Sequence, residues 1–283
     1  MKNLISMRKY LLLIVALGHL SFIDAKTILW DLGGVLFKVD RLGMSYYELG
    51  WKDFASYMVW DQRSPNNLKD LLFDDLLYRI DAQTPDSFIA YMPDGRRMAP
   101  IMMDWLKGMI SGHELCNKLH QIIKDLDTRH YFVSERERVL LEKMVKVVFD
   151  PQVLARYTKL VNAGIELVEL CRKSGCANIV VSNWDPFSYA HLLRTGPGRK
   201  IFQLFGQHYI FISGANGIMK PDVALFKKVI EQYHLNPADC LFVDDQIENI
   251  RAAESCGIKS YWFQGDYKAL KNVLIQEGCL PLS

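Results

Sequence analysis

The sequence predicts an α/β protein whose parallel sheet is interrupted by a long helical insert. After residue 26, short β-rich runs alternate with helical stretches, which is the pattern of parallel-sheet proteins. Half of the 283 residues are hydrophobic and 23% are charged, so the composition is that of a globular protein. Between the first two predicted strands the apolar residues recur at helix spacing, as in Leu68, Leu71, Leu72, Leu76 and Ile80.

Residues 1–25 have the pattern of a secretory signal peptide. Basic residues precede an apolar run from Tyr10 to Ile23, and Ala25 then offers a small residue for cleavage. The run is shorter than the roughly 20 residues that a spanning helix needs. We therefore expect export, to a periplasm or by secretion, with no stable membrane span once the signal is removed. An uncleaved anchor and an ordinary buried helix are the alternatives; without cleavage the protein would be membrane-anchored or cytoplasmic.

Four short apolar runs are predicted to be strands of one sheet: residues 27–30, 178–181, 240–243 and 259–263. The first three lead directly into polar residues, which are Asp31, Ser182 and the pair Asp244 and Asp245. The carboxyl ends of parallel strands form the ligand crevice of open α/β sheets, so we expect these residues to meet at one site.

A segment of about residues 43–155 is predicted to be an all-helical insert. Two pairs at capping-box spacing precede apolar-periodic runs, Ser111 with Glu114 and Ser134 with Glu137. We expect the apolar stripes of these helices to pack into a core rather than to bind a cofactor.

Charge and cysteine content exclude some classes of partner. The 34 basic and 32 acidic residues nearly cancel, and no run of Lys or Arg indicates a nucleic-acid surface. The six cysteines lack CxxC pairs, so a thiolate metal site is not expected. Export would permit disulfides, with Cys171 and Cys176 nearest in sequence; burial as small hydrophobic residues is the alternative.

Asp31 ends the first predicted strand and is followed by Gly33 and Gly34, where the backbone can turn tightly and approach a ligand. A carboxylate placed there can attack phosphorus if a cation screens its charge. The same short pattern is typical of an ordinary turn after a strand. Its interpretation therefore depends on the other segments.

Those segments supply further polar groups. Ser182 and Asn183 offer a hydroxyl and an amide for phosphate oxygens, and Lys220 places a positive charge ahead of a predicted helix. The pair Asp244 and Asp245 is a more specific indication of a functional site than these residues, because adjacent carboxylates repel each other unless a cation or hydrogen bonds compensate. The ordinary alternatives are a surface lysine and, for Asp245, a helix N-cap.

Taken in order, these segments resemble the four signature motifs of the haloacid dehalogenase superfamily of hydrolases. The motifs correspond to residues 31–36, 181–184, 219–222 and 242–245. Residues 106–111 also resemble a helix junction of the family's helical caps. The resemblance implies a Rossmann-like parallel-sheet core, residues 26–42 and 156–283, with residues 43–155 as an inserted helical cap.

The resemblance also implies a Mg²⁺-dependent phosphatase that acts on a small phosphorylated metabolite. Asp31 would form an aspartyl phosphate, with Ser182 and Lys220 as the other catalytic residues. The substrate phosphate would contact Gly34, Ser182, Asn183 and Lys220. Mg²⁺ would be held by Asp31, the carbonyl of Gly33, Asp244 and Asp245.

One position departs from the family pattern. Family phosphatases usually carry a second Asp two residues after the nucleophile, as general acid and base, and here that residue is Gly33. Its carbonyl can still bind metal, but it cannot transfer a proton, a function worth about 10²- to 10⁴-fold in rate. Asp40, Asp61 and Asp185 are candidate substitutes by proximity to the motifs or the cap.

Two other functions fit the same motifs. A catalytically silent binding protein would keep the fold without the carboxylate at position 33. A 2-haloacid dehalogenase would use the same Asp nucleophile on carbon without a metal, but the pair Asp244 and Asp245 argues against it, because that pair has little purpose without a cation.

Overall fold

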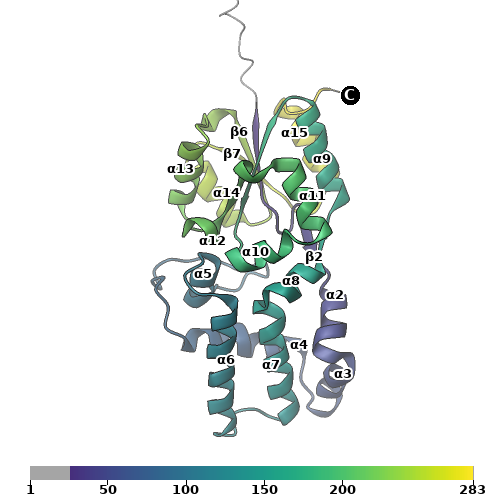
Figure 1. The fold of residues 1–283 in the computed structure, drawn as a ribbon, viewed down its shortest axis with the longest axis vertical. Helices are drawn as coiled ribbons and strands as arrows, with labels where there is room; N and C mark the ends of the chain where they lie inside the picture. The colour runs from purple at the N-terminus through teal and green to yellow at the C-terminus, as the bar shows by residue number, and fades with distance from the viewer. Residues whose placement is uncertain (1–25, 283) are drawn as a thin grey trace, which may run out of the picture.

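A computed structural model describes residues 26–282 of the chain; the predicted signal peptide, residues 1–25, lies outside the described residues. A five-stranded parallel sheet has the strand order β5-β4-β1-β6-β7 (Figure 1). Its strands are β1 (Thr27–Trp30), β4 (Ala177–Ser182), β5 (Ile210–Ile212), β6 (Cys240–Asp244) and β7 (Lys259–Trp262). The α/β prediction is confirmed, and the four predicted strands are present. The short strand β5 was not predicted.

The central strand β1 is buried along its whole length. Successive side chains of a strand point to opposite faces, so Ile28 and Trp30 join one hydrophobic cluster and Leu29 joins another. Helices α9, α11 and α15 supply the first cluster, and α13 and α14 supply the second (Figure 1). The helices of this part are α9 (Asn162–Lys173), α10 (Pro186–Leu192), α11 (Gly196–Phe205), η4 (Gln207–Tyr209), α12 (Ser213–Asn216), α13 (Val223–Gln232), η5 (Pro237–Asp239), α14 (Ile247–Glu254) and α15 (Tyr267–Gln276).

Residues 41–157 form a helical segment below the sheet in Figure 1. Ser111 makes both hydrogen bonds of a capping box with Glu114, and the Ser134 hydroxyl accepts from the Glu137 amide, as the sequence pattern predicts. The segment has a hydrophobic core of its own, which includes Leu72, Leu119 and Leu140. Its helices are α2 (Arg41–Met44), η1 (Ser45–Gly50), α3 (Trp51–Trp60), α4 (Pro65–Lys69), η2 (Asp70–Asp75), η3 (Leu76–Arg79), α5 (Pro100–Leu106), α6 (Gly112–Asp127), α7 (Glu135–Phe149) and α8 (Pro151–Tyr157).

A two-stranded antiparallel ribbon joins the helical segment to the sheet. Strand β2 (Phe37–Val39) carries the chain into the segment and β3 (Thr158–Leu160) carries it out, and the two pair with each other. The sequence pattern did not predict this ribbon, because each strand has only three residues.

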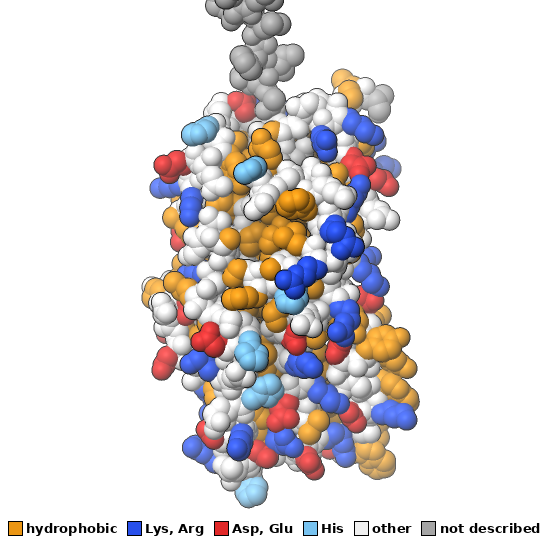
Figure 2. Space-filling model, in the orientation of Figure 1, with side chains coloured by type: hydrophobic (Ala, Val, Ile, Leu, Met, Phe, Trp, Pro, Cys, Tyr) orange, Lys and Arg blue, Asp and Glu red, His pale blue; other side chains and the backbone are white. Residues whose placement is uncertain are grey.

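The surface mixes both signs of charge. Figure 2 shows Lys and Arg side chains interspersed with Asp and Glu, in keeping with the absence of a basic run in the sequence. Hydrophobic side chains also gather at its lower right edge, where Figure 1 shows α2 and α3; the exposed residues there include Leu42, Tyr47 and Trp60.

All six cysteines are free thiols. Within residues 26–282, no helix combines the length and the apolar character needed to cross a membrane.

Candidate active site

Asp31 lies immediately after β1, the middle strand of the sheet, and its amide donates to the carbonyl of Val243 at 3.0 Å. Its carboxylate is buried beside Lys220. Burial raises the pKa of Asp31 to about 6; Lys220 lowers this pKa, while Asp244 raises it further. The residue predicted as nucleophile is therefore a buried carboxyl group whose charge depends on nearby cations.

Lys220 is 1% exposed and donates from Nζ to three oxygens. These are Asp31 Oδ1 at 2.7 Å, Asp244 Oδ2 at 2.6 Å and the carbonyl of Val181 at 2.9 Å. Burial alone lowers the pKa of Lys220, but the two carboxylates outweigh burial and raise it. The ammonium group consequently stays charged and neutralises the centre of the site.

Asp244 and Asp245 have different surroundings although they are adjacent. Asp244 is fully buried, and its second oxygen accepts hydrogen bonds from the Asn249 amide at 2.9 Å and the Gln246 backbone at 2.8 Å. Asp245 has no ion-pair partner among the described residues, and burial, followed by Asp31 and Asp244, raises its pKa to about 7. Asp244 thus holds Lys220, whereas Asp245 carries an uncompensated carboxyl group.

The three aspartates fit a hard divalent cation. One carboxylate oxygen from each of Asp31, Asp244 and Asp245 lies within 4.8 Å of the other two. Oxygen-only donors rich in carboxylate suit Mg²⁺. In the described part of the chain, no other group of three or more His, Cys, Asp or Glu side chains meets this distance.

Gly33 and Gly34 occupy different kinds of position. Gly34 has a φ of +72°, and a Cβ on it would overlap the carboxylate of Asp245. A Cβ on Gly33 would meet only Asp31 Oδ2, at 3.8 Å, which is ordinary contact. A side chain at position 34 would therefore strain the backbone and displace the Asp245 carboxylate, whereas position 33 leaves room for one.

Ser182 is the last residue of β4, which lies next to β1 in the sheet, and Asn183 follows it. The buried Ser182 side chain lies beside Asp31 and lowers the pKa of that carboxyl group. The Asn183 side chain accepts from the Lys220 amide at 2.8 Å and donates to the Lys220 carbonyl at 2.9 Å. It therefore fixes the loop that carries Lys220, and a phosphate contact by Asn183 would have to come from its backbone.

The three candidate substitutes for the missing acid have other partners. Asp40 caps α2 and pairs with Lys159 at 2.6 Å, and its pKa is lowered. Asp61 accepts from Ser134 at 2.6 Å and from Arg136 at 2.9 Å within the helical segment. Asp185 caps α10, and burial raises its pKa.

Sequence reasoning missed Ser213, which joins the helical segment to this site. Its hydroxyl is fully buried, donates to the Leu106 carbonyl at 2.7 Å and accepts from the Trp184 amide at 2.9 Å. The residue lies outside all four motifs, six positions before the motif at residues 219–222. Only the unpredicted strand β5, which ends just before Ser213, could have indicated it.

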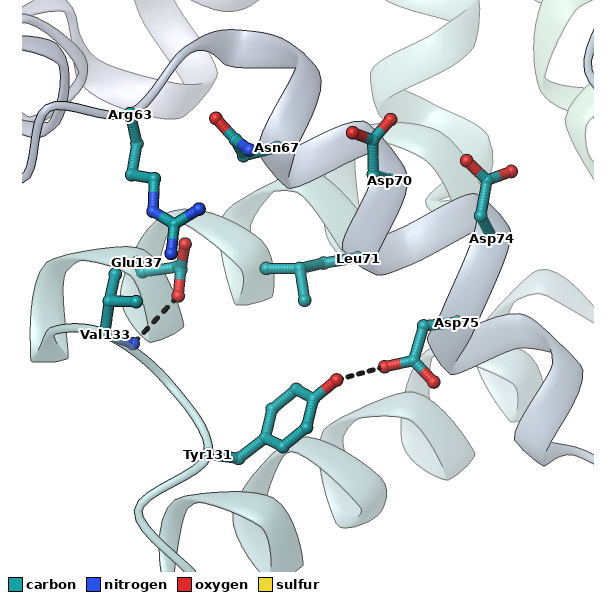
Figure 3. A pocket seen from close by; sticks show the side chains of 9 residues that line it. All are labelled: Arg63, Asn67, Asp70, Leu71, Asp74, Asp75, Tyr131, Val133 and Glu137. Atoms are coloured by element: carbon teal, nitrogen blue, oxygen red, sulfur yellow. Dashed lines mark hydrogen bonds between the residues drawn. The ribbon is translucent and has the colours of Figure 1, made fainter.

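A pocket of about 400 Å³ lies elsewhere, within the helical segment (Figure 3). It is lined by acidic side chains, including Asp70 and Asp74. In Figure 3 the Tyr131 hydroxyl donates to Asp75, and Glu137 accepts from the backbone of Val133. None of the motif residues lines this pocket.

A sequence model of the haloacid dehalogenase-like hydrolase family matches residues 25–257, which include every motif residue of the site. The chain belongs to this family. The matched range also includes the whole helical segment, so this hydrolase is matched across both of its parts.

Two curated relatives of this haloacid dehalogenase-like hydrolase are named as phosphatases. A sesquiterpene phosphatase of Aspergillus oryzae is 32% identical over 24% of this chain and 38% of its own length. A glyceraldehyde 3-phosphate phosphatase of Pyrococcus furiosus is 31% identical over 22% of this chain and 27% of its own length. The matched part thus spans less than two fifths of either relative.

Solved structures show the same fold. A haloacid dehalogenase family enzyme of Bacteroides thetaiotaomicron, in complex with magnesium and inorganic phosphate, has a TM-score of 0.50 at 18% identity, covering 87% of this chain and 98% of its own. A predicted family hydrolase of Porphyromonas gingivalis has a TM-score of 0.50 at 18% identity, covering 88% and 98%. At this level of identity the likeness shows the fold.

Proposed function

We propose that this hydrolase is a Mg²⁺-dependent phosphatase that cleaves phosphomonoesters through an aspartyl phosphate on Asp31. The observation that carries the proposal is the pair of ion contacts of buried Lys220, with Asp31 on one side and Asp244 on the other. A buried lysine here neutralises a carboxylate that must approach an anionic phosphate. The phosphatase names of the two relatives, and the magnesium and phosphate of the Bacteroides structure, support this reaction class.

The residues divide the reaction into two steps. Asp31 attacks phosphorus, so that a carboxylate oxygen to phosphorus bond forms and the ester bond breaks, and the leaving oxygen takes a proton from solvent. Water then attacks the same phosphorus and gives a proton to solvent, which releases inorganic phosphate and restores the Asp31 carboxylate. Lys220 would favour the ionised form of Asp31 before the first step and offset the charge that returns to it in the second. The Ser182 hydroxyl and the backbone of Gly34 and Asn183 would position the phosphate oxygens.

Asp31, Asp245 and the Gly33 carbonyl would hold Mg²⁺, and Asp244 would support it while holding Lys220. When bound, Mg²⁺ supplies positive charge to the carboxylates and to the phosphoryl oxygens. Its charge would also lower the raised pKa values of Asp31 and Asp245, which favours their ionised forms.

The leaving group receives no proton from position 33. Gly33 has no side chain, and Asp40 and Asp61 are engaged in ion pairs. Substrates whose leaving groups need little protonation, such as sugar 1-phosphates or acyl phosphates, would then react fastest. The same absence favours one other candidate, a silent binding protein that holds a phosphorylated ligand without turnover.

We further propose that the helical segment is the cap of this enzyme, with the boundaries that the sequence predicts, residues 43–155. The hydrogen bond from the Ser213 hydroxyl to the Leu106 carbonyl supports a position of the helical segment over the catalytic loops. We also propose that the protein is exported after loss of residues 1–25.

The test is phosphate release from a panel of phosphoesters and acyl phosphates, measured with Mg²⁺ and with EDTA. We expect release that requires Mg²⁺ and falls at least about 1,000-fold in Asp31→Asn. Release that persists in Asp31→Asn would remove the nucleophile assignment. Tight phosphate binding without turnover would favour the binding protein, and metal-independent release of halide from a 2-haloacid would favour the dehalogenase.

A further inference from the structure

The helical segment contains a second cavity, of about 450 Å³, with a lining unlike that of the acidic pocket. Its wall is mainly aliphatic, aromatic and thioether carbon from η1, α4, η2, α5 and α7. Buried wall residues include Leu49, Leu68, Phe73, Trp105, Met144 and Val147. An apolar interior of this size suits an apolar ligand, because a polar ligand would lose its hydration without gaining hydrogen bonds there.

Two stretches of chain lead from the catalytic loops to this cavity. Gly33 forms a β-bridge with Phe37, the first residue of β2. Val39, which lines the cavity, is two residues farther along this strand, about 7 Å from Phe37. On another side, Trp105 lines the cavity, and the carbonyl of the next residue accepts from Ser213. The backbone therefore connects two walls of the cavity with the catalytic loops, while the motif residues themselves do not line the cavity.

Charged side chains at the rim of the cavity affect which amphiphilic ligands it favours. Arg41 and Lys69 lie on it, and neither has an ion-pair partner within residues 26–282. Asp94 also lies on the rim and shares Arg96 with Asp70 and Asp74. Arg41 and Lys69 therefore supply the cations without ion-pair partners at the rim within residues 26–282, and they attract the anionic group of an amphiphile.

We propose that the cavity receives the hydrocarbon part of the substrate, and that the substrate class is therefore an organic phosphate with a long apolar chain. Within this class, a long-chain acyl phosphate should react faster than an alkyl phosphate, because its leaving group needs no proton. At about 30 Å³ per water-sized group, the volume accommodates on the order of ten methylene groups. This inference rests on the proposed phosphatase function for the position of the phosphate, while the apolar binding site stands on the cavity itself.

Chain length provides the first measurement. Each buried methylene contributes about 0.8 kcal/mol, or roughly a fourfold change in an equilibrium constant. We expect kcat/KM for n-alkyl phosphates to rise by at least about 100-fold from ethyl to decyl phosphate, below the micelle concentration. The rise should lie mainly in KM, because the reacting groups are the same.

Variants that fill the cavity provide the second measurement. Ser45 and Val148 are half-buried wall residues, so Ser45→Trp and Val148→Trp place a large side chain in the cavity. We expect the decyl to ethyl ratio of kcat/KM to fall about tenfold or more in each variant. Tyr47→Trp is the matched control, because Tyr47 lies in the same helix η1, is 74% exposed and does not line the cavity. Its ratio should equal that of the unmodified protein.

Binding of decyl phosphate to Asp31→Asn, measured by calorimetry, separates the cavity from catalysis. Binding that is lost in both filled variants, without hydrolysis by the unmodified protein, would sustain the cavity and overturn the phosphatase proposal. Hydrolysis of ethyl and decyl phosphate with equal kcat/KM, unchanged in both filled variants, would overturn the cavity inference and leave the phosphatase proposal intact. Absence of both hydrolysis and decyl phosphate binding would overturn both. Circular dichroism of each variant confirms that it is folded.

Discussion

The ammonium group of Lys220 lies 2.7 Å from Asp31 and is enclosed with it in the interior, at the end of the central strand. A buried ion pair contributes little by itself, but removal of one partner leaves an uncompensated buried charge. The pair therefore links the stability of the fold to the chemistry of the site.

Lys220→Met should destabilise the protein by about 3–5 kcal/mol, because Asp31 and Asp244 would remain buried without their shared cation. Urea unfolding at pH 7.5 measures this change. Lys200→Met is the control: it removes an exposed ion pair with Glu169 and should cost about 1 kcal/mol or less. Equal losses in the two variants would contradict the role assigned to Lys220.

Substitutions of the two glycines should have opposite outcomes. Gly34→Ala places a Cβ against the Asp245 carboxylate at a positive φ, so we expect loss of Mg²⁺ binding and of activity. Gly33→Ala meets no close contact and should fold and bind Mg²⁺ as the unmodified protein does. Calorimetric Mg²⁺ titration distinguishes them. A Gly34→Ala protein with unchanged Mg²⁺ affinity would show that this close approach does not matter.

Gly33→Asp tests the missing acid directly. The site has room for the Cβ, and a carboxyl group there restores the proton transfer that the family uses. We expect about 10²- to 10⁴-fold faster phosphate release from alkyl phosphates and little change for acyl phosphates, whose leaving groups need no proton. Steady-state kinetics on both substrate types gives the ratio. An equal effect on the two types would indicate another cause.

The metal-free protein should lose stability as pH rises. Folding raises the pKa of Asp31 from 3.8 to about 6 and that of Asp245 from 3.8 to about 7. Below about pH 4 both groups are neutral in the folded and the unfolded chain, so they impose no penalty. Between about pH 4 and pH 7 the two groups ionise in the unfolded chain, in water, before they ionise in the fold, and this difference favours unfolding. Above pH 7 they are ionised in both states but are buried only in the fold. Thermal melts in EDTA should therefore show a Tm that falls from about pH 4 to pH 7 and stays low at pH 8.

Mg²⁺ should remove most of this fall, because its charge compensates the ionised carboxylates, so the gain in Tm on adding Mg²⁺ should be larger at pH 8 than at pH 5. Asp245→Asn provides the control and should flatten the EDTA curve. An EDTA curve that rises between pH 5 and pH 8 would contradict the assigned pKa directions.

Local patterns predicted much of the architecture. The apolar runs of β1, β4 and β6 and the cap of α6 at Ser111 depend on neighbouring residues, so the sequence reveals them. Strand β5 has three residues and the ribbon strands also have three, which is too short for a recognisable period. Pairing with distant segments, rather than local preference, stabilises them.

In the candidate site, too, features with a local sequence signal were predicted and features that depend on distant residues were not. The motif residues were identified from order and spacing, and Asp31, Lys220 and Asp244 do meet in the fold. The separate environments of Asp244 and Asp245 were not predictable, because the two residues are chemically identical and only their positions in the fold differ: Asp244 ends β6 and Asp245 follows it. The bonds of Asn183 to the Lys220 backbone join residues 37 positions apart and have no local signal.

The ribbon of β2 and β3 has a mechanical consequence. The chain passes between the sheet and the helical segment at two points, and the pairing of Phe37 with Leu160 and of Val39 with Thr158 holds these points side by side. The two parts are therefore covalently joined along one edge. Opening of the crevice would rotate the helical segment about this edge. The hydrogen bond from the Ser213 hydroxyl to the Leu106 carbonyl would have to break for this rotation.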